Sequence, residues 1–530
     1  MKRALILASL LAIAVAAQTA APAPPSAPAP APAPAPQSEP APFTSAPPVS
    51  APPVSAPLAL APPALAPPAL APFPNWQDLK FPALRSPNIP KPEEFTLPNG
   101  MRVYLLEDHE LPLISGAALV RTGNLFDPPD KVGLAEITGA VIRSGGTSKL
   151  TGDQIDALLE NVAASVESGI AESSGSVSFS CLRENTDLTL GLFHDVLTAP
   201  EFREDKIELM RTQYRSGISR RNDDPGGIAN REFANTIYGH DTPYGWMPEY
   251  ATIGNIRRDD LIAFYKRYYF PANVMLAVIG DFRAAEMRDR LTALFKDWTS
   301  TQPPVPKFPE VRKLDAAGVY LATKPDVNQT FFEVGHLGGM LSDKDFAALD
   351  VASDILGGGV SSRLVRRIRT KLGYAYGISG GWEAHYDHPG LFEIAGSTQS
   401  KYTVETLQAI REEIEKMRAS EVSDDELRIA RDKVENSFVF SFDRPSKTLD
   451  RVIRYDYFGY PRDFIFRFQK AVESVTKADV LRVCREYFDP KRLTVIAVGN
   501  PAGFGRPLTE LGLPVRPIDL TIPGPGTPSK

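Results

Sequence analysis

The stretch DDLIAFYKRYYFPANVMLAVIGDF, residues 259–282, joins a helix pattern to a buried strand pattern. Apolar residues recur at helical spacing in LIAFYKRYY, and Pro271 marks a corner before the continuous apolar run VMLAVIG. A second copy of this unit, ADVLRVCREYFDPKRLTVIAVGNP, occupies residues 478–501, with its corner at Pro490. The chain therefore contains one helix-to-strand plan twice.

Each copy closes a longer repeat that opens on another strand pattern. The first opens with MRVYLLED, residues 101–108, and the second with GVYLATKP, residues 318–325. Val103 aligns with Val319, an offset of 319 minus 103, or 216 positions. The repeat predicts an α+β fold of two homologous domains, each a mostly antiparallel sheet with helices packed on one face.

The chain of 530 residues is long enough for two such domains. We place the first domain at residues 79–300, the second at residues 301–515, and a Pro/Gly-rich tail at residues 516–530. The two cysteines, Cys181 and Cys484, lie in apolar contexts and are expected to be buried thiols.

The N-terminus has the pattern of a secretory signal peptide. A charged start precedes an apolar stretch and small residues, so we assign residues 1–17 to a cleavable signal, with an uncleaved anchor as the alternative. Residues 18–78 are almost entirely Ala and Pro and predict a disordered, polyproline-like linker. We expect export to the periplasm or another exported location, and no transmembrane segment beyond the signal.

The charge pattern argues against nucleic-acid binding. The formal net charge is −6, and Lys and Arg are spread along the chain without a basic run. A phosphate backbone needs a concentrated patch of positive charge. We therefore expect no nucleic-acid partner.

Several blocks together resemble the pitrilysin/insulinase family of zinc peptidases, in its two-domain, processing-peptidase-like branch. The most specific is LDVASDILGGGVSSRLVRRIRTKLGYAYGISG, which starts at Leu349. The others are GLAEITGAVIRSGGTS from Gly133, DDPGGIANREFANTIYGHDTPYG from Asp223, and the strand end VIGDF. The resemblance covers the chain from about Phe95 to Gly499 and implies the duplicated metallopeptidase fold.

The resemblance also shows which family residues are missing. Active members carry His-x-x-Glu-His on one helix face, where two imidazoles hold zinc and the Glu acts as base. The matching positions are Glu136, Gly139 and Ala140, none of which can take its role. We therefore expect no metal and no cofactor in this chain. The helix after Glu201, which supplies a third ligand in the family, is basic here, although Glu208 lies nearby.

The histidines offer no replacement motif. There are six in the chain, without a His-Glu-x-x-His arrangement in either direction, and the one close pair is HYDH, His385 to His388. Gly and Pro flank this segment, so a surface loop is favoured over a metal site.

Two further family features differ in how well they match. Active relatives pair substrate with an edge strand, and the matching positions here are Glu167 and Ser168. The family also uses an Arg and a Tyr seven positions apart to hold the substrate backbone and stabilise the oxyanion. Arg369 and Tyr376 match them, with Tyr374 as the competing hydroxyl.

These features predict a non-catalytic, substrate-clamping subunit of a heterodimeric periplasmic zinc peptidase. Arg369 and Tyr376 would act in trans on unfolded peptide substrates, while a homologous partner with the intact His-x-x-Glu-His motif supplies zinc. Alone, the chain is expected to be inactive. The alternative is a proteolytically inactive peptide-binding or assembly-scaffold protein, and a third possibility, an active peptidase with an unconventional metal site, has little support from so few histidines.

Overall fold

The structure is a computed structural model that describes residues 89–524. The predicted signal peptide, the Ala/Pro-rich linker, residues 79–88 of the first domain and residues 525–530 of the tail lie outside the described residues. Within residues 89–524, no helix is both long and apolar enough to cross a lipid bilayer.

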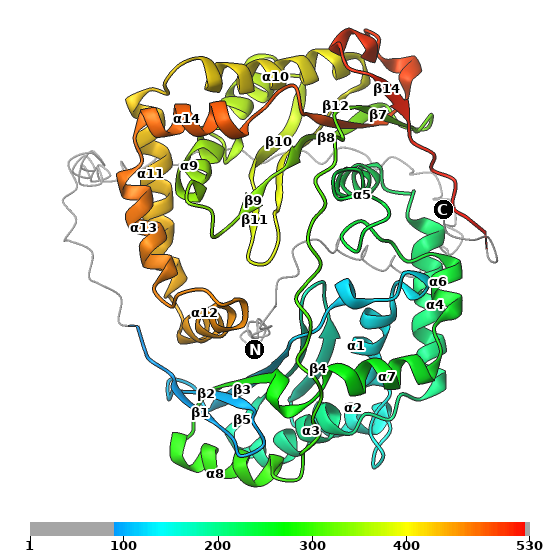
Figure 1. The fold of residues 1–530 in the computed structure, drawn as a ribbon, viewed down its shortest axis with the longest axis vertical. Coiled ribbons are helices and arrows are strands. Elements are labelled where there is room, and N and C mark those ends of the chain that lie inside the picture. The colour runs from blue at the N-terminus through cyan, green and yellow to red at the C-terminus, as the bar shows by residue number, and fades with distance from the viewer. Residues whose placement is uncertain (1–88, 525–530) are drawn as a thin grey trace, which may run out of the picture. The chain divides into compact units, whose positions relative to one another are not determined.

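Two six-stranded sheets with helices form the described part of the chain (Figure 1). The first sheet has the order β1-β2-β6-β3-β5-β4. Its strands are β1 (Glu93–Thr96), β2 (Arg102–Glu107), β3 (Leu113–Val120), β4 (Ser165–Ile170), β5 (Gly175–Leu182) and β6 (Val274–Gly280). The helices in this part of the sequence are α1 (Leu134–Ser144), α2 (Gly152–Glu160), α3 (Thr186–Thr198), α4 (Glu204–Arg220), α5 (Pro225–Tyr238), α6 (Tyr250–Asn255), α7 (Arg258–Tyr268) and α8 (Ala284–Phe295).

The second sheet has the order β10-β12-β8-β13-β7-β14. Its strands are β7 (Gly318–Thr323), β8 (Gln329–Leu337), β10 (Ala375–Trp382), β12 (Leu391–Gln399), β13 (Thr494–Gly499) and β14 (Val515–Pro517), and a small pair is formed by β9 (Gly339–Met340) and β11 (Ala384–His385). The helices are α9 (Phe346–Gly357), α10 (Thr403–Ala419), α11 (Asp424–Phe438), α12 (Pro445–Phe458), α13 (Phe464–Ser474) and α14 (Lys477–Tyr487).

The predicted fold class and internal repeat are confirmed by the strand orders. Read from its other edge, the second sheet places β7, β13, β8, β12 and β10 where the first has β2, β6, β3, β5 and β4. The central parallel pair recurs as β2 with β6 and as β7 with β13, and most other pairs are antiparallel. The edge strand β14 pairs in parallel with β7, so the sheet extends into the segment that the sequence assigned to a tail.

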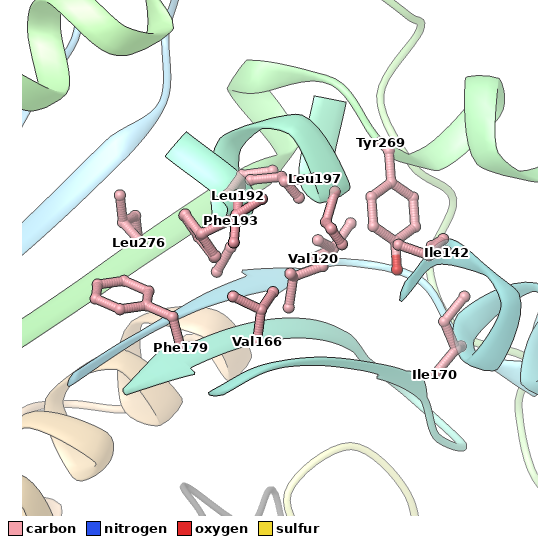
Figure 2. Packing of buried hydrophobic residues seen from close by; sticks show 14 of the residues in the cluster. Val120, Ile142, Val166, Ile170, Phe179, Leu192, Phe193, Leu197, Tyr269 and Leu276 are labelled. Atoms are coloured by element: carbon pink, nitrogen blue, oxygen red, sulfur yellow. The ribbon is translucent and has the colours of Figure 1, made fainter. Parts of the chain in front are cut away.

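Each sheet buries one face against helices of its own half. In the first half, Leu192, Phe193 and Leu197 of α3 lie over Val166 and Phe179 of the sheet (Figure 2). A separate core in the second half joins α9, α10 and α14 to their sheet. Cys181 belongs to the first core and Cys484 to the second, and both thiols are free and buried, as predicted.

The opposite face of each sheet is covered by a helix from the other half, in addition to the predicted layer of its own helices on one face. Helix α12 packs on β2 and β6, and α5 packs on β8 and β13 (Figure 1). Val103 and Leu105 of β2 enter their own core, whereas Tyr104 meets Ile453 and Tyr457 of α12. Because both faces of β6 and β13 are buried, their sequences are largely apolar rather than alternating, whereas β8 also contains Glu333 and His336.

Candidate functional site

The degenerate zinc motif lies on α1, whose first turn is held by a buried carboxylate. Asp127 accepts hydrogen bonds from the backbone N–H groups of Gly133, at 2.8 Å, and Ala135, at 2.9 Å. Burial raises the pKa of Asp127 to about 7, although these N–H groups act in the opposite direction. The helix N-terminus is thus fixed by an acidic cap from the preceding loop.

Glu136 occupies the first motif position but is committed to other side chains. Its carboxylate accepts a hydrogen bond from Asn124 Nδ2 at 3.0 Å and another from the Tyr214 hydroxyl of α4. Burial and the nearby Glu136 carboxylate raise the pKa of Tyr214, so its phenol keeps its proton and donates. The pocket that holds Glu136 is therefore a carboxylate–phenol–amide network without an imidazole among these partners.

Helix α4 presents Tyr214 to Glu136, and its nearby acid Glu208 is paired elsewhere. Glu208 is half exposed and accepts from Arg211 at 2.8 Å and from Arg215 at 2.7 Å. These guanidinium groups lower the pKa of Glu208. Basic residues of α4 therefore pair with Glu208, the acid that the sequence places nearest to the expected third zinc ligand.

Gly139, which the sequence aligned with the family's base, lies directly against β4. A Cβ at Gly139 would lie 2.3 Å from the backbone nitrogen of Ile170 and 2.7 Å from the carbonyl carbon of Gly169. Neither atom belongs to a flexible side chain, so any residue other than glycine requires the strand to move. This position is now part of the helix–strand packing.

The candidate substrate strand β4 is an edge strand, but α1 already engages it. Ser168 Oγ donates to the Gly139 carbonyl at 2.6 Å and accepts from Arg143 N at 3.0 Å. Arg143 Nε donates to the Val166 carbonyl at 2.9 Å. Glu167 is exposed and points away from these contacts along the strand. An added peptide strand would have to compete with α1 for the Val166 carbonyl.

The structure brings Arg369 and Tyr376 together at the edge of the other sheet. Arg369 lies in a π-helical segment, Val365–Lys371, which is followed by Gly373 in a left-handed conformation (φ +65°) and then by β10. The Arg369 guanidinium carbon is 5.2 Å from the centre of the Tyr376 ring. Tyr376 is 86% exposed, which is unusual for so large an aromatic side chain.

Local geometry distinguishes Tyr376 from its neighbour. The Tyr374 ring stacks on Tyr402 with 4.5 Å between ring centres, and Ala375 points into the core. The pairing of β10 with β12 shifts register between Ala375 and Ile378, which leaves Tyr376 at an irregular point of the edge. The exposed phenol near Arg369 is therefore that of Tyr376.

A groove lies over β8, β10 and β12 of the second sheet, and its lining in β10 begins at Gly377, the residue after Tyr376. Its volume is about 500 Å³, and small residues of β10 and β12 line it, among them Gly377, Ser379 and Ser397. Glu333 of β8 lies at its floor and pairs with Glu393. Burial and the neighbouring carboxylate raise the pKa of Glu333, so the pair retains a proton.

The HYDH segment differs from the sequence-based interpretation. His388 is 3% exposed and His385 is half-buried, so the surface-loop interpretation is wrong for His388. A nitrogen of each imidazole lies within 4.8 Å of a carboxylate oxygen of Glu172, which belongs to the turn between β4 and β5. Glu172 was not singled out from the sequence because it lies 213 positions before His385 (385 minus 172), and no local pattern connects them.

Comparisons with known proteins agree with this geometry. One family profile, described as insulinase (peptidase family M16), matches residues 102–242, and a second, described as peptidase M16 inactive domain, matches residues 255–434. The chain belongs to the insulinase (M16) peptidase family.

Relatives within the M16 family carry different names. An uncharacterized zinc protease of Streptomyces coelicolor is 23% identical over 401 residues, covering 74% of this chain and 86% of that protein. A non-peptidase homolog of Helicobacter pylori is 22% identical, covering 74% of this chain and 90% of that protein. A solved peptidase M16 inactive domain from Pseudomonas fluorescens shares the fold with a TM-score of 0.69 and 21% identity, covering 77% and 98% of the two chains. Together with the lost motif, these matches support an inactive M16 subunit.

Proposed function

We propose that this chain is a substrate-clamping M16 subunit of a periplasmic heterodimer. A homologous partner with an intact His-x-x-Glu-His motif supplies the catalytic zinc, and this chain supplies Arg369 and Tyr376. The observation that carries the proposal is the exposed pairing of these two side chains at 5.2 Å on a sheet edge. A guanidinium and a phenol are both suitable donors to a peptide carbonyl that becomes an oxyanion.

The surroundings of the pair support peptide binding. The groove of about 500 Å³ is lined by Gly377, which follows Tyr376 in β10, and by other small residues of β10 and β12. Because β10 is an edge strand, an extended peptide could add to it through backbone hydrogen bonds while Arg369 and Tyr376 hold one carbonyl. The β4 edge is less suitable, since Arg143 already occupies the Val166 carbonyl.

The test combines the purified chain with an M16 partner that carries the intact motif, first to measure co-purification and then cleavage of an unfolded peptide. Arg369→Ala or Tyr376→Phe should slow turnover by the cost of an oxyanion donor, about 100-fold or more. Tyr374→Phe is the matched control, because its ring stacks on Tyr402, and it should leave turnover unchanged. Equal effects of Tyr374→Phe and Tyr376→Phe would refute the proposed role.

The chain alone should hydrolyse no peptide. Cleavage by the isolated chain that is sensitive to a chelator and abolished by Glu136→Ala would contradict the division of labour. A specific observation favours the second candidate, an inactive peptide-binding or scaffold protein: α1 contacts the β4 edge on which active relatives bind substrate. That candidate predicts peptide binding that depends on Arg369 and Tyr376, with no gain in cleavage on adding the partner.

A further inference from the structure

Three side chains from the two halves converge at one point outside the degenerate motif. Glu172, His385 and His388 each offer a ligand atom, and these atoms lie within 4.8 Å of one another. His388 Nε2 is 3.9 Å from Glu172 Oε1, and the two imidazole rings are 4.4 Å apart at an angle of 68°. Two imidazoles and a carboxylate form a ligand set that zinc and similar divalent ions prefer.

The second nitrogen of His388 is already oriented. His388 Nδ1 is 2.9 Å from Asp387 Oδ1, a carboxylate that is largely buried. A carboxylate that accepts the Nδ1 proton leaves Nε2 unprotonated and directed at Glu172, which is the arrangement of metal-bound histidines with an outer carboxylate. Asp387 would therefore act as a positioning residue for the ligand His388.

The carboxylates around the two imidazoles favour binding of a cation. Glu172, Glu383 and Asp387 bring three carboxylates around the two imidazoles, and Asp387 and His388 are largely buried. Within residues 89–524, no Lys or Arg forms an ion pair with any of these three acids. Buried negative charge without a paired cation is costly, and a divalent ion would balance it.

Both ligand-bearing turns are held in place by backbone contacts. Leu341 N donates to the His385 carbonyl at 3.0 Å, and the Tyr460 hydroxyl donates to the Tyr386 carbonyl at 3.0 Å. The Glu172 turn is closed by Ala171 N donating to the Ser174 carbonyl at 2.8 Å. Ligands on turns fixed in this way need little rearrangement to bind an ion.

We propose that Glu172, His385 and His388 form a transition-metal site, with zinc as the best-fitting ion, that fastens the HYDH turn of the second half to the β4–β5 turn of the first. In a tetrahedral zinc site, bonds of about 2.0–2.2 Å put neighbouring ligand atoms roughly 3.3–3.5 Å apart. The His388–Glu172 separation of 3.9 Å is within a small side-chain adjustment of that value. This site is distinct from the Glu136 motif.

A cavity adjoins the site and leaves room for a further ligand. Its volume is about 330 Å³, it lies between the first sheet and α12, and Glu172 and His385 are among its lining residues. The three protein ligands leave one tetrahedral position open, which water or a carboxylate can fill. The proposal departs from the sequence-based prediction that the chain holds no metal, and it does not depend on the proposed function.

The experiment titrates Zn²⁺ alone into the full chain after removal of metal with a chelator. The wild type should bind one Zn²⁺ per chain, and Co²⁺ should give the intense visible absorption of a tetrahedral site. Asp387→Asn, which changes a residue outside the ligand set, should weaken Zn²⁺ binding by about 10–100-fold. Glu172→Gln and His388→Gln each remove a ligand and should weaken Zn²⁺ binding by more than that. The control replaces two exposed imidazoles, His109→Gln with His240→Gln, and should bind as the wild type does.

A second measurement distinguishes a lost site from a misfolded chain. Zn²⁺ should raise the unfolding temperature of the wild type and the control but not of Glu172→Gln, since binding to the native state alone stabilises it. Should His388→Gln fail to fold, Glu172→Gln decides, because its carboxyl group is partly exposed. Absence of a stoichiometric Zn²⁺ in the wild type, or equal binding by Glu172→Gln and the control, would overturn the proposal.

Discussion

Gly139 offers a sharp test of how α1 and β4 pack. The substitution Gly139→Ala adds one methyl group at a point 2.3 Å from the backbone nitrogen of Ile170. Ordinary contacts of a Cβ atom begin near 3.4 Å, so the strand or the helix must move by the difference, about 1 Å. That movement strains the hydrogen bonds that Ser168 and Arg143 make between α1 and β4.

The expected change in the free energy of unfolding combines two destabilising effects and one stabilising effect. Overpacking costs about 1–3 kcal/mol. Weakening one of the three hydrogen bonds adds about 0.5–1.5 kcal/mol. Alanine gains up to about 1 kcal/mol over glycine in a helix interior. We expect Gly139→Ala to lower the free energy of unfolding by about 2 kcal/mol, measured by urea unfolding followed by circular dichroism and tryptophan fluorescence.

The matched control is Gly217→Ala in α4. A Cβ at Gly217 meets no heavy atom within 4 Å, so this variant should keep the helix-propensity gain and stabilise the chain by about 0.5–1 kcal/mol. If Gly139→Ala were as stable as Gly217→Ala, the close packing of α1 on β4 would be refuted. The same packing predicts that restoring Glu at position 139 destabilises the chain and does not recreate a zinc motif.

Three further predictions concern the supports of the site and the contacts between halves. Arg363 binds Glu426 through two hydrogen bonds of 2.7 and 2.9 Å and lowers the pKa of Glu426 to about 2. Because this pKa lies below the ordinary 4.5, the stabilisation is present above about pH 4.5 and is lost as the pH falls toward 2. Glu426→Gln should therefore cost about 1.5–3 kcal/mol at pH 7, and the difference from wild type should vanish near pH 2 in unfolding experiments; a constant difference across this range would contradict the assignment. Phe233 is fully buried where α5 meets the second sheet. Phe233→Ala should therefore lower the free energy of unfolding by about 3–5 kcal/mol in urea, and a loss below about 1 kcal/mol would argue against that packing. Tyr104→Phe removes the 2.7 Å hydrogen bond to Asp456 across the halves and should cost about 1.5–3 kcal/mol in urea unfolding, and an unchanged free energy of unfolding would contradict this bond.

Local sequence patterns were sufficient for the fold class. The period of apolar residues in residues 259–282 and 478–501 predicted the helix and strand that α7 with β6 and α14 with β13 form. Gly373, in the left-handed conformation, ends the helical segment that carries Arg369, and β10 begins two residues later at Ala375. These features depend on neighbours within a few residues, so the sequence contains the information directly.

Contacts between distant segments were decided only by the tertiary structure. Three contacts join residues that share no local pattern. Helices α5 and α12 each pack on the sheet of the other half, Gly139 lies against β4, and Glu172 lies near His385 and His388. Such contacts depend on how whole sheets and helices pack, because burying complementary apolar surfaces is favourable whatever their separation along the chain. The sequence by itself therefore determined which elements form and which catalytic groups are absent, whereas packing decided which remaining groups meet.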